Sequence, residues 1–436
     1  MNRESPHSIC EHAGVRYDES LTPDPRSPIP SPFFLPARWV VVGVLVLSTS
    51  LSFLDRQVLA ALAPILKQEF SLSNEGYGYI VSAFSLAYAI VALPAGAFID
   101  RVGLTRGVSA VVAVWSLAAM ATGLTGGLAG LVACRAWLGA AEAGGIPATG
   151  KGFALYLEPR ERAMGTALNQ VGITLGMVAA PLFAGWLAVA YGWRAAFVGT
   201  GALGFLWIPL WLVVLRRVRA PQAQAPAAAA GGRGPGRDWR LWALAAANIL
   251  MMTVYSLWTN WTTVFLVSAH GLTQAQANAR LAWIPPVFAS LGGLFGGWLS
   301  MVYARRGDSL YAARFRACVV AAILLTSTAA VPLAPGAGLA TALISLSFFM
   351  AVAMSANIYA MPLDLFGARH AAFAVSVLTA SYGLMQTVVS PLFGRLIDRV
   401  GFGAVCGLAG LLPLASLGVL WLVGRVSGRA EGESRP

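Results

Sequence analysis

The sequence predicts an all-α membrane protein with twelve transmembrane helices in two six-helix halves. Three observations lead to this prediction. The 436-residue chain is 57% hydrophobic and only 11% charged, with a mean hydropathy of +0.69, whereas soluble domains carry about 25% charged residues. Apolar stretches of about 20 residues recur, and this length spans a bilayer core. A basic segment rich in Pro, Ala and Gly, at residues 216–238, separates six such stretches from six more.

The apolar stretches are predicted to be helices, because lipid leaves no partner for unpaired backbone groups and barrel strands would alternate over about 10 residues. Small residues four apart, such as Gly172 and Gly176 or Gly292 and Gly296, let such helices approach closely. The predicted spans are 38–66, 76–99, 106–126, 129–152, 163–190, 194–215, 239–268, 277–303, 312–332, 337–363, 371–394 and 401–424.

The domain organisation follows from these spans. A polar tail with seven prolines is predicted to be disordered, and it lacks the pattern of a signal peptide. The two halves echo each other, since Pro-Leu-Phe recurs at Pro181 and Pro391. Parallel repeats of this kind place the substrate site of secondary transporters at mid-membrane, between the halves. The predicted order is a tail at 1–37, a first half at 38–215, a linker at 216–238, a second half at 239–424 and a second tail at 425–436.

The net charge of +12 reports membrane topology. With a cytoplasmic N-terminus, 23 of the 30 Lys and Arg residues fall in cytoplasmic segments, which is the positive-inside asymmetry. Both termini are therefore predicted to lie in the cytoplasm of a bacterium, with the chain in its inner membrane and no nucleic-acid partner. The four cysteines are scattered singly, without metal or disulfide spacing. No phosphate-binding glycine loop is present, so we expect no cofactor, and the energy source is expected to be an ion gradient or the gradient of the substrate itself.

Four charged residues lie well inside predicted spans, where each costs about 3 kcal/mol and marks a functional site by default; every other charge lies at a predicted helix end or in a loop. Asp55 and Arg56 lie in the first span, and Arg135 and Glu142 lie seven residues apart on one face of the fourth. Asp55 and Arg135 lie at compatible depths for pairing. Asp55 and Glu142 are the predicted proton carriers, while Arg56 is a fixed cation suited to a substrate carboxylate. The alternative is a neutral cluster that only holds the two spans together.

Uncharged polar and aromatic residues of the spans are predicted to line the substrate cavity, although any one of these aromatics is often a packing residue. The loop after the second span is predicted to be a gate that caps helix ends, with a solvated basic turn as the alternative. The cavity residues are Tyr88, Asn169, Gln170, Thr174, Tyr255, Trp258, Asn260, Trp261, Asn357, Tyr359, Ser381, Tyr382 and Gln386. The gating residues are Gly96, Asp100, Arg101, Gly103 and Arg106.

Several motifs together resemble those of one transporter group, the anion:cation symporters of the major facilitators, and in particular its bacterial hexuronate, aldonate and aldarate transporters. The resemblance covers residues 38–424. It is carried by Leu54-Asp55-Arg56, residues 77–84 (YGYIVSAF), Asp100-Arg101, Arg135-x-x-x-Gly139-x-x-Glu142-Ala143-Gly144, Pro159-x-Glu161-Arg162-Ala163, residues 191–197 (YGWRAAF), residues 282–285 (AWIP) and residues 362–366 (PLDLF).

The resemblance implies proton symport of a sugar acid. It implies that Asp55 and Glu142 are the protonated acids, that Arg135 couples to Asp55, and that Arg56 meets the substrate carboxylate. The sequence departs from the group at three places, with Gly145 where Asn is usual, Phe53 where Tyr is frequent, and Ser300-Met301 where Ser-Asp is usual. The first two departures bear on which substrate hydroxyls are recognised, and the third is expected to weaken a gate in the second half.

The predicted function is proton-coupled import of a small organic anion by alternating access, in a monomer without enzyme activity. A sugar acid is the first choice of substrate, and a non-sugar carboxylate such as tartrate or an aromatic acid is the second. An anion exchanger for phosphate esters would need cations in both halves, and the seventh span has none beyond Arg240 at its very beginning. A drug exporter would favour an apolar cavity without Arg56. A membrane enzyme or sensor would need a catalytic constellation or an added domain.

Overall fold

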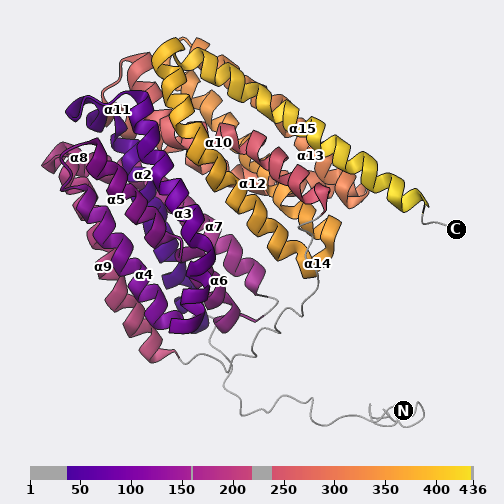
Figure 1. Ribbon diagram of the computed structural model, residues 1–436, viewed down its shortest axis with the longest axis horizontal. Helices are drawn as coiled ribbons and strands as arrows, with labels where there is room; N and C mark the ends of the chain where they lie inside the picture. Colours follow the sequence, from indigo (N-terminus) through magenta and orange to yellow (C-terminus); the bar gives the residue numbers. More distant parts are fainter. Residues whose placement is uncertain (1–36, 159–160, 219–237, 434–436) are drawn as a thin grey trace, which may run out of the picture. The chain divides into compact units, whose positions relative to one another are not determined.

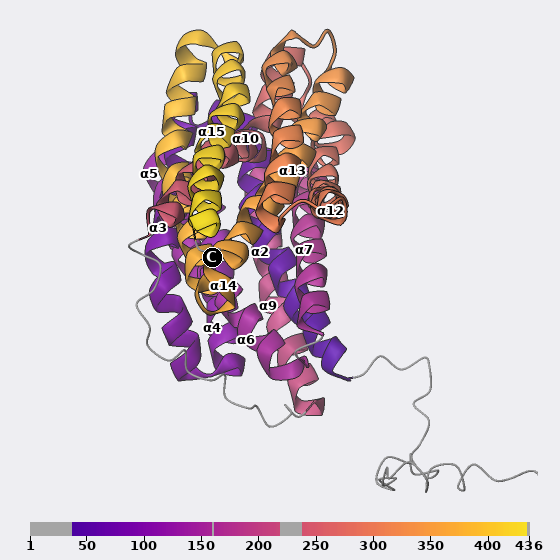
Figure 2. The ribbon, with the colours of Figure 1, turned by 90° about the vertical axis from the view of Figure 1, so that its right-hand side faces the viewer.

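A computed structural model describes residues 37–158, 161–218 and 238–433. Helices and short connections make up these residues, and no strand occurs in them. Figure 1 shows the helices of the first half, from indigo to magenta, gathered in one bundle and those of the second half, from salmon to yellow, in another; Figure 2 gives the view turned by 90°. At some positions only the backbone is described, namely Leu93, Asp100, Ala163, Leu363, 367–373 and 426–433.

The helices coincide with the predicted spans. The first half contains α2 (Ala37–Glu69), α3 (Asn74–Val102), α4 (Leu104–Thr122), α5 (Leu128–Glu142), α6 (Gly145–Tyr156), α7 (Arg162–Ala179), the π-helix η3 (Ala180–Ala184), α8 (Gly185–Tyr191) and α9 (Trp193–Arg217). The second contains α10 (Trp239–His270), α11 (Gln274–Ala277), the π-helix η5 (Asn278–Ala282), α12 (Ile284–Arg305), α13 (Leu310–Leu325), the 3₁₀ helix η6 (Thr326–Leu333), α14 (Ala337–Val400) and α15 (Phe402–Glu433).

Within the described residues, nine helical segments are long and apolar enough to cross a membrane. The other three predicted spans correspond to α3, to α5 together with α6, and to the later part of α14. Helices therefore occupy all twelve predicted spans, and the predicted all-α fold is confirmed. We call the end of the bundle where α9 ends and α10 begins the linker end, and the end where α2 gives way to α3 the far end.

Two predicted spans run together in α14, which continues for 64 residues. A straight helix would separate Phe348 from Tyr382 by about 51 Å, at 1.5 Å per residue. Both rings nevertheless contact Tyr255, with ring centroids 5.4 and 6.3 Å away respectively. The chain must therefore reverse direction between them, and α14 supplies two antiparallel arms, in agreement with the predicted tenth and eleventh spans.

The fourth predicted span is broken directly after Glu142. Helix α5 ends at this residue, and α6 begins at Gly145 after a two-residue turn. Pro147 lacks the N–H that would bond to the Ala143 carbonyl, so the regular hydrogen-bond pattern cannot continue through the turn. The break places the Glu142 carboxylate at a helix end in the interior of the protein, where its side chain is fully buried.

A buried core joins the two halves towards the far end. Tyr77 of α3 packs edge-on against Trp261 of α10, with ring centroids 5.0 Å apart. The Tyr77 hydroxyl donates a hydrogen bond to the backbone carbonyl of Asn260 at 2.9 Å. Leu62 and Leu66 of α2 belong to the same buried cluster. The packing of aromatic rings from both halves closes this end of the structure.

Glycines permit close contacts between helices, as the sequence predicts. A Cβ at Gly176 would collide with the backbone of Ser50 in α2, and one at Gly296 would collide with the backbone of Ala353 in α14. A Cβ at the neighbouring Gly297 would meet no atom within 4 Å. Gly176 and Gly296 are therefore required by packing, whereas Gly297 is not.

Gly296 and Gly297 provide a matched test of helix packing. We expect Gly296→Ala to lower the free energy of unfolding by about 1–3 kcal/mol, because backbone atoms must move to admit the methyl group. Gly297→Ala should be neutral or stabilising by up to about 1 kcal/mol, since Ala favours a helix. Thermal unfolding of the purified proteins measures both, and equal effects of the two substitutions would contradict this account.

Candidate functional site

A buried ion pair between the first and fourth spans forms the centre of the candidate site. Arg56 of α2 donates a hydrogen bond from Nε to Oε2 of Glu142 at 2.5 Å. Ser52, one helical turn before Arg56, donates from its hydroxyl to the same oxygen at 2.9 Å. The Glu142 side chain is fully buried, while that of Arg56 retains 20% of its exposure. Arg56 is therefore accessible on one side and neutralised on the other.

Three aromatic rings surround the Arg56 guanidinium. Its central carbon lies 4.6 Å from the ring centroid of Phe53, 5.0 Å from that of Phe84 and 4.8 Å from that of Tyr88. Each distance lies within the roughly 6 Å range of a cation–π interaction. Phe53 shares a helix face with Arg56 at a spacing of three residues, and the other two rings come from α3. The cage orients the cation independently of Glu142.

Asp55 and Arg135 lie behind this pair with little access to solvent, each at 2% exposure. Arg135 donates from Nη1 to the backbone carbonyl of Asp55 at 3.5 Å, and its guanidinium lies 5.9 Å from the ring of Phe197. Both carboxylate oxygens of Asp55 lack a hydrogen-bond partner among the described residues, as do Nε and Nη2 of Arg135. Buried polar groups are usually paired, so these atoms of Asp55 and Arg135 are exceptions to that rule.

The pairing differs from the one expected. We predicted that Asp55 would pair with Arg135 and that Arg56 would face the cavity. In the structure Arg56 is ion-paired with Glu142 of α5, and Arg135 of the same helix reaches only the backbone carbonyl of Asp55. Depth along the membrane is readable from sequence, but the rotation of one helix against another is set by packing.

The second half faces Arg56 with aromatic hydroxyls. Tyr255 of α10 and Tyr382 of α14 lie within electrostatic range of the Arg56 guanidinium. The Tyr255 hydroxyl also donates to the sulfur of Met177 in α7, at 3.8 Å. Each tyrosine can donate or accept a hydrogen bond, and thus Arg56 is opposed by groups that suit the hydroxyls of a polar ligand.

Beyond Arg56, towards the far end, the space between the halves is small. A cavity of about 30 Å³ is bordered by Gln57 of α2 and by Trp258, Thr259 and Thr262 of α10. The Nε1 of Trp258 and the hydroxyl of Thr259 have no partner among the described residues, and the volume admits a water molecule. It is far below the 300–1,000 Å³ of a typical ligand pocket, so this cavity is too small for a substrate.

The remaining predicted cavity residues do not all lie around Arg56. Tyr88, Tyr255 and Tyr382 lie around Arg56 as described. Thr174 of α7 contacts the hydroxyl of Ser290 in α12, which places it between the halves. Asn169 accepts a hydrogen bond from Thr49 at 2.8 Å. Trp258, Asn260 and Trp261 lie in or beside the far-end core. Gln170 is exposed, and Tyr359 and Gln386 are half-buried.

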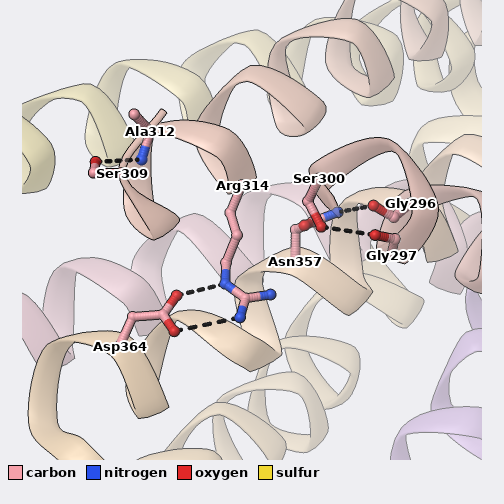
Figure 3. Close-up of polar contacts among 8 residues, drawn as sticks. All are labelled: Gly296, Gly297, Ser300, Ser309, Ala312, Arg314, Asn357 and Asp364. Atoms are coloured by element: carbon pink, nitrogen blue, oxygen red, sulfur yellow. Dashed lines mark hydrogen bonds and ion pairs between the residues drawn. The ribbon is translucent and has the colours of Figure 1, made fainter. Parts of the chain in front are cut away.

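Two predicted cavity residues take part in helix packing within the second half. Figure 3 shows Asn357, whose amide donates to the backbone carbonyl of Gly296 at 3.0 Å. Ser381 donates to the carbonyl of Leu378 at 2.7 Å and accepts from the amide of Asn248 at 3.3 Å. These hydrogen bonds hold helices together, and both side chains are buried away from Arg56.

The gating residues lie at the end of α3 and the beginning of α4. Gly103 ends α3 with a φ of 88°, a conformation that glycine adopts without strain. Arg101 and Arg106 are exposed, and Gly96 is half-buried. The side chain of Asp100 lies outside the described residues. That Ser300-Met301 weakens the second-half gate stays a prediction. Beside this segment Arg314 of α13 and Asp364 of α14 form an ion pair, with Nη2 and Oδ1 3.3 Å apart (Figure 3).

Tyr88 was predicted to line the cavity, but Ser52, Phe53 and Phe84 were not predicted to orient Arg56. Ser52 and Phe53 precede it by four and three residues, a spacing that places side chains on one helix face. That spacing was a usable signal. Phe84 comes from another helix, and no sequence signal connects it to Arg56.

Comparisons with known proteins agree with this architecture. The profile of the Major Facilitator Superfamily matches residues 45–385. The chain is 28% identical to the hexuronate transporter of Escherichia coli K12, over 88% of this chain and 94% of that one. It is also 28% identical to the probable sulfoacetate transporter SauU of Cupriavidus necator, over 87% and 93%. A crystal structure of a bacterial homolog of the human lysosomal transporter Spinster superposes with a TM-score of 0.75 at 22% identity, covering 90% and 98%.

Proposed function

Since this chain belongs to the Major Facilitator Superfamily, we propose that it imports a small organic anion together with a proton, with a sugar acid as the favoured substrate. It is a multi-pass membrane transporter and not an enzyme. In this proposal the protein lies in a bacterial inner membrane with the linker end in the cytoplasm. The observation that supports this proposal is the ion pair of Arg56, a cation between the halves, with Glu142. In the proposal a substrate carboxylate replaces Glu142 as the counter-ion of Arg56.

Competition for Arg56 supplies the coupling between proton and substrate. While Glu142 is ionised, it occupies the Nε edge of the guanidinium at 2.5 Å. A proton taken up by Glu142 converts the carboxylate to a neutral acid and leaves Arg56 without its counter-ion. The aromatic cage keeps the guanidinium in place, and a substrate carboxylate can then bind it. Loss of the proton reverses the competition and expels the substrate.

Asp55 and Arg135 are the second pair of groups whose partners change in this proposal. In the described arrangement the Asp55 carboxylate has no hydrogen-bond partner, and an isolated buried charge is costly. A proton on Asp55 removes that charge. When the halves reopen, water reaches the pair, Asp55 releases its proton and a direct contact with Arg135 becomes favourable. The number of protons per substrate then depends on whether one or both carboxylates exchange.

The sugar-acid assignment rests on two supports. A relative with 28% identity over most of both chains carries the name hexuronate transporter. The tyrosine hydroxyls opposite Arg56 offer partners for several substrate hydroxyls. The second candidate is a non-sugar anion such as tartrate or a sulfonate, because another relative at the same identity is named a probable sulfoacetate transporter.

Uptake into proteoliposomes with an imposed inward proton gradient tests the proposal. The panel contains glucuronate, galacturonate, galactonate, glucarate, tartrate, an aromatic acid and sulfoacetate. We expect accumulation of a sugar acid that a protonophore abolishes. Accumulation of only a non-sugar anion would keep the mechanism and overturn the substrate class. Equal uptake with and without the proton gradient would contradict symport and favour an exchanger.

A further inference from the structure

A carboxylate of the second half caps a helix of the first half at the far end. Helix α3 begins at Asn74, and the first N–H groups of a helix have no partner within it. The Asp398 carboxylate, near the end of α14, accepts from the backbone N–H of Asn74 at 3.0 Å and from that of Glu75 at 2.9 Å. It also accepts from the side-chain amide of Asn74 at 2.7 Å. A single side chain thus makes three hydrogen bonds between the halves.

The residues around Asp398 repeat a motif of the first half. Residues 96–103 read GAFIDRVG, and residues 394–401 read GRLIDRVG. Both octapeptides end a helix in the same way, since the N–H of Gly103 bonds to the Ile99 carbonyl at 3.1 Å and that of Gly401 bonds to Ile397 at 3.0 Å. The first copy follows the second span and the later one follows the eleventh, so they lie at opposite ends of the bundle.

Neighbouring contacts align the two helices for this cap. Arg395 donates from Nε and Nη2 to the Glu75 carboxylate, at 3.1 and 2.5 Å. Gly394 and Gly78 have no room for a Cβ, because the backbone of the opposite helix occupies that space. Ser82 donates to the Thr387 carbonyl at 2.5 Å. Helix α3 and the second arm of α14 are therefore in close contact from the far end inwards.

A second set of hydrogen bonds between the halves lies where α2 contains Pro64. The backbone N–H of Ile65 donates to the side-chain carbonyl of Gln274 at 3.2 Å, and the Ala61 carbonyl accepts from the amide of Asn278 at 2.8 Å. Gln274 and Asn278 are four residues apart at the beginning of the eighth span, on one helix face. Pro64 disturbs the hydrogen bonding of α2 at this point, and amides of the other half bind to the backbone groups beside it.

We propose that Asp398 is a latch that holds the far end of the transporter closed, by capping α3 across the boundary between the halves. Opening the far end separates α14 from α3, breaks all three hydrogen bonds and returns the N-terminus of α3 to water. The cap therefore biases the protein towards the state open at the linker end. The inference rests on the alternating access of the proposed function, but not on the substrate or on the proton.

The latch can be tested on the full chain in lipid without any substrate. Spin labels at Leu124→Cys and Leu333→Cys report the distance between far-end loops of the two halves, because both side chains are more than 80% exposed. The four native cysteines are first replaced. We expect Asp398→Ala to raise the ratio of far-end-open to far-end-closed protein about tenfold at low ionic strength, which is the scale of a helix cap aided by the helix dipole.

Two further variants sharpen the test. Arg395→Gln removes an exposed ion pair and should change the same ratio about twofold. The control is Glu69→Gln, which removes a contact of 3.3 Å with Arg194 on the same face but within the first half; it should leave the ratio unchanged. A distance distribution for Asp398→Ala that matches the wild type would overturn the latch. So would an equal shift in Glu69→Gln, since the effect would then be one of surface charge.

The result separates the latch from the proposed function. Asp398 is exposed and lies at the far end of the bundle, away from Arg56 of α2, so the distance measurement is independent of substrate affinity. Failure of uptake in the wild type, with the expected response of the distances to Asp398→Ala, would remove the substrate assignment and keep the latch. Normal proton-driven uptake with unchanged distances would do the reverse.

Discussion

Replacing Glu142 by Gln is expected to abolish the accumulation of substrate against its gradient. With one coupled proton, a pH difference of one unit sustains at most about a tenfold accumulation, because it is worth about 1.4 kcal/mol. The variant cannot take up a proton at this position, so internal and external substrate should equalise. Exchange of labelled for unlabelled substrate should continue, since the amide mimics the protonated acid and leaves Arg56 available.

The experiment compares proton-driven accumulation with counterflow exchange in the same liposomes. Glu161→Gln serves as the control, because Glu161 pairs with Arg38 at 2.7 Å outside the candidate site and should retain both activities. Asp55→Asn completes the series and should also lose accumulation if both acids exchange protons. Full proton-driven accumulation in both Glu142→Gln and Asp55→Asn would show that the four charges are only a structural cluster.

Substitution of Arg56 should have the second large effect, on binding and stability together. Arg56→Gln removes the partner of a substrate carboxylate, and we expect the KM for uptake to rise at least about 30-fold. It also leaves Glu142 buried and unpaired, which should lower the free energy of unfolding by about 3 kcal/mol. Arg56→Lys keeps the charge but loses the planar stacking on the three rings, and we expect an intermediate rise in KM.

The double variant Arg56→Gln/Glu142→Gln separates the two consequences. It removes both charges at once, so most of the stability should return, while substrate binding should stay lost. Thermal unfolding measures the first quantity and uptake kinetics the second. Recovery of both in the double variant would mean that Arg56 serves stability alone and that the substrate carboxylate binds elsewhere.

Much of the fold was readable from the sequence because the bilayer imposes it. Apolar stretches of membrane-spanning length must be helical, and helices cover every predicted span. Depth was equally readable: Asp55, Arg56, Arg135 and Glu142 were placed in spans by residue number, and all four lie together in the interior. Asn357 and Ser381 show the limit, since polar residues in a helix serve packing as readily as binding, and composition does not distinguish the two.

The far-end contacts were partly visible in the sequence and were not recognised. The octapeptide at 394–401 was a recognisable signal that a second copy of the gating motif follows the eleventh span. Its partner was not legible, because nothing in the sequence links Asp398 to Asn74, more than 300 residues away.

The sequence by itself determined the class of protein, the twelve spans and the set of intramembrane charges. These depend on hydrophobicity and helix rise, which are local properties of the chain. Only the tertiary structure decided which charges pair, since that depends on the rotation of α2 against α5 at the close contacts made by small residues. It also decided that Arg56 stands in an aromatic cage and that Asp398 caps α3. Such contacts join distant segments, and packing geometry selects among partners that the sequence leaves equivalent.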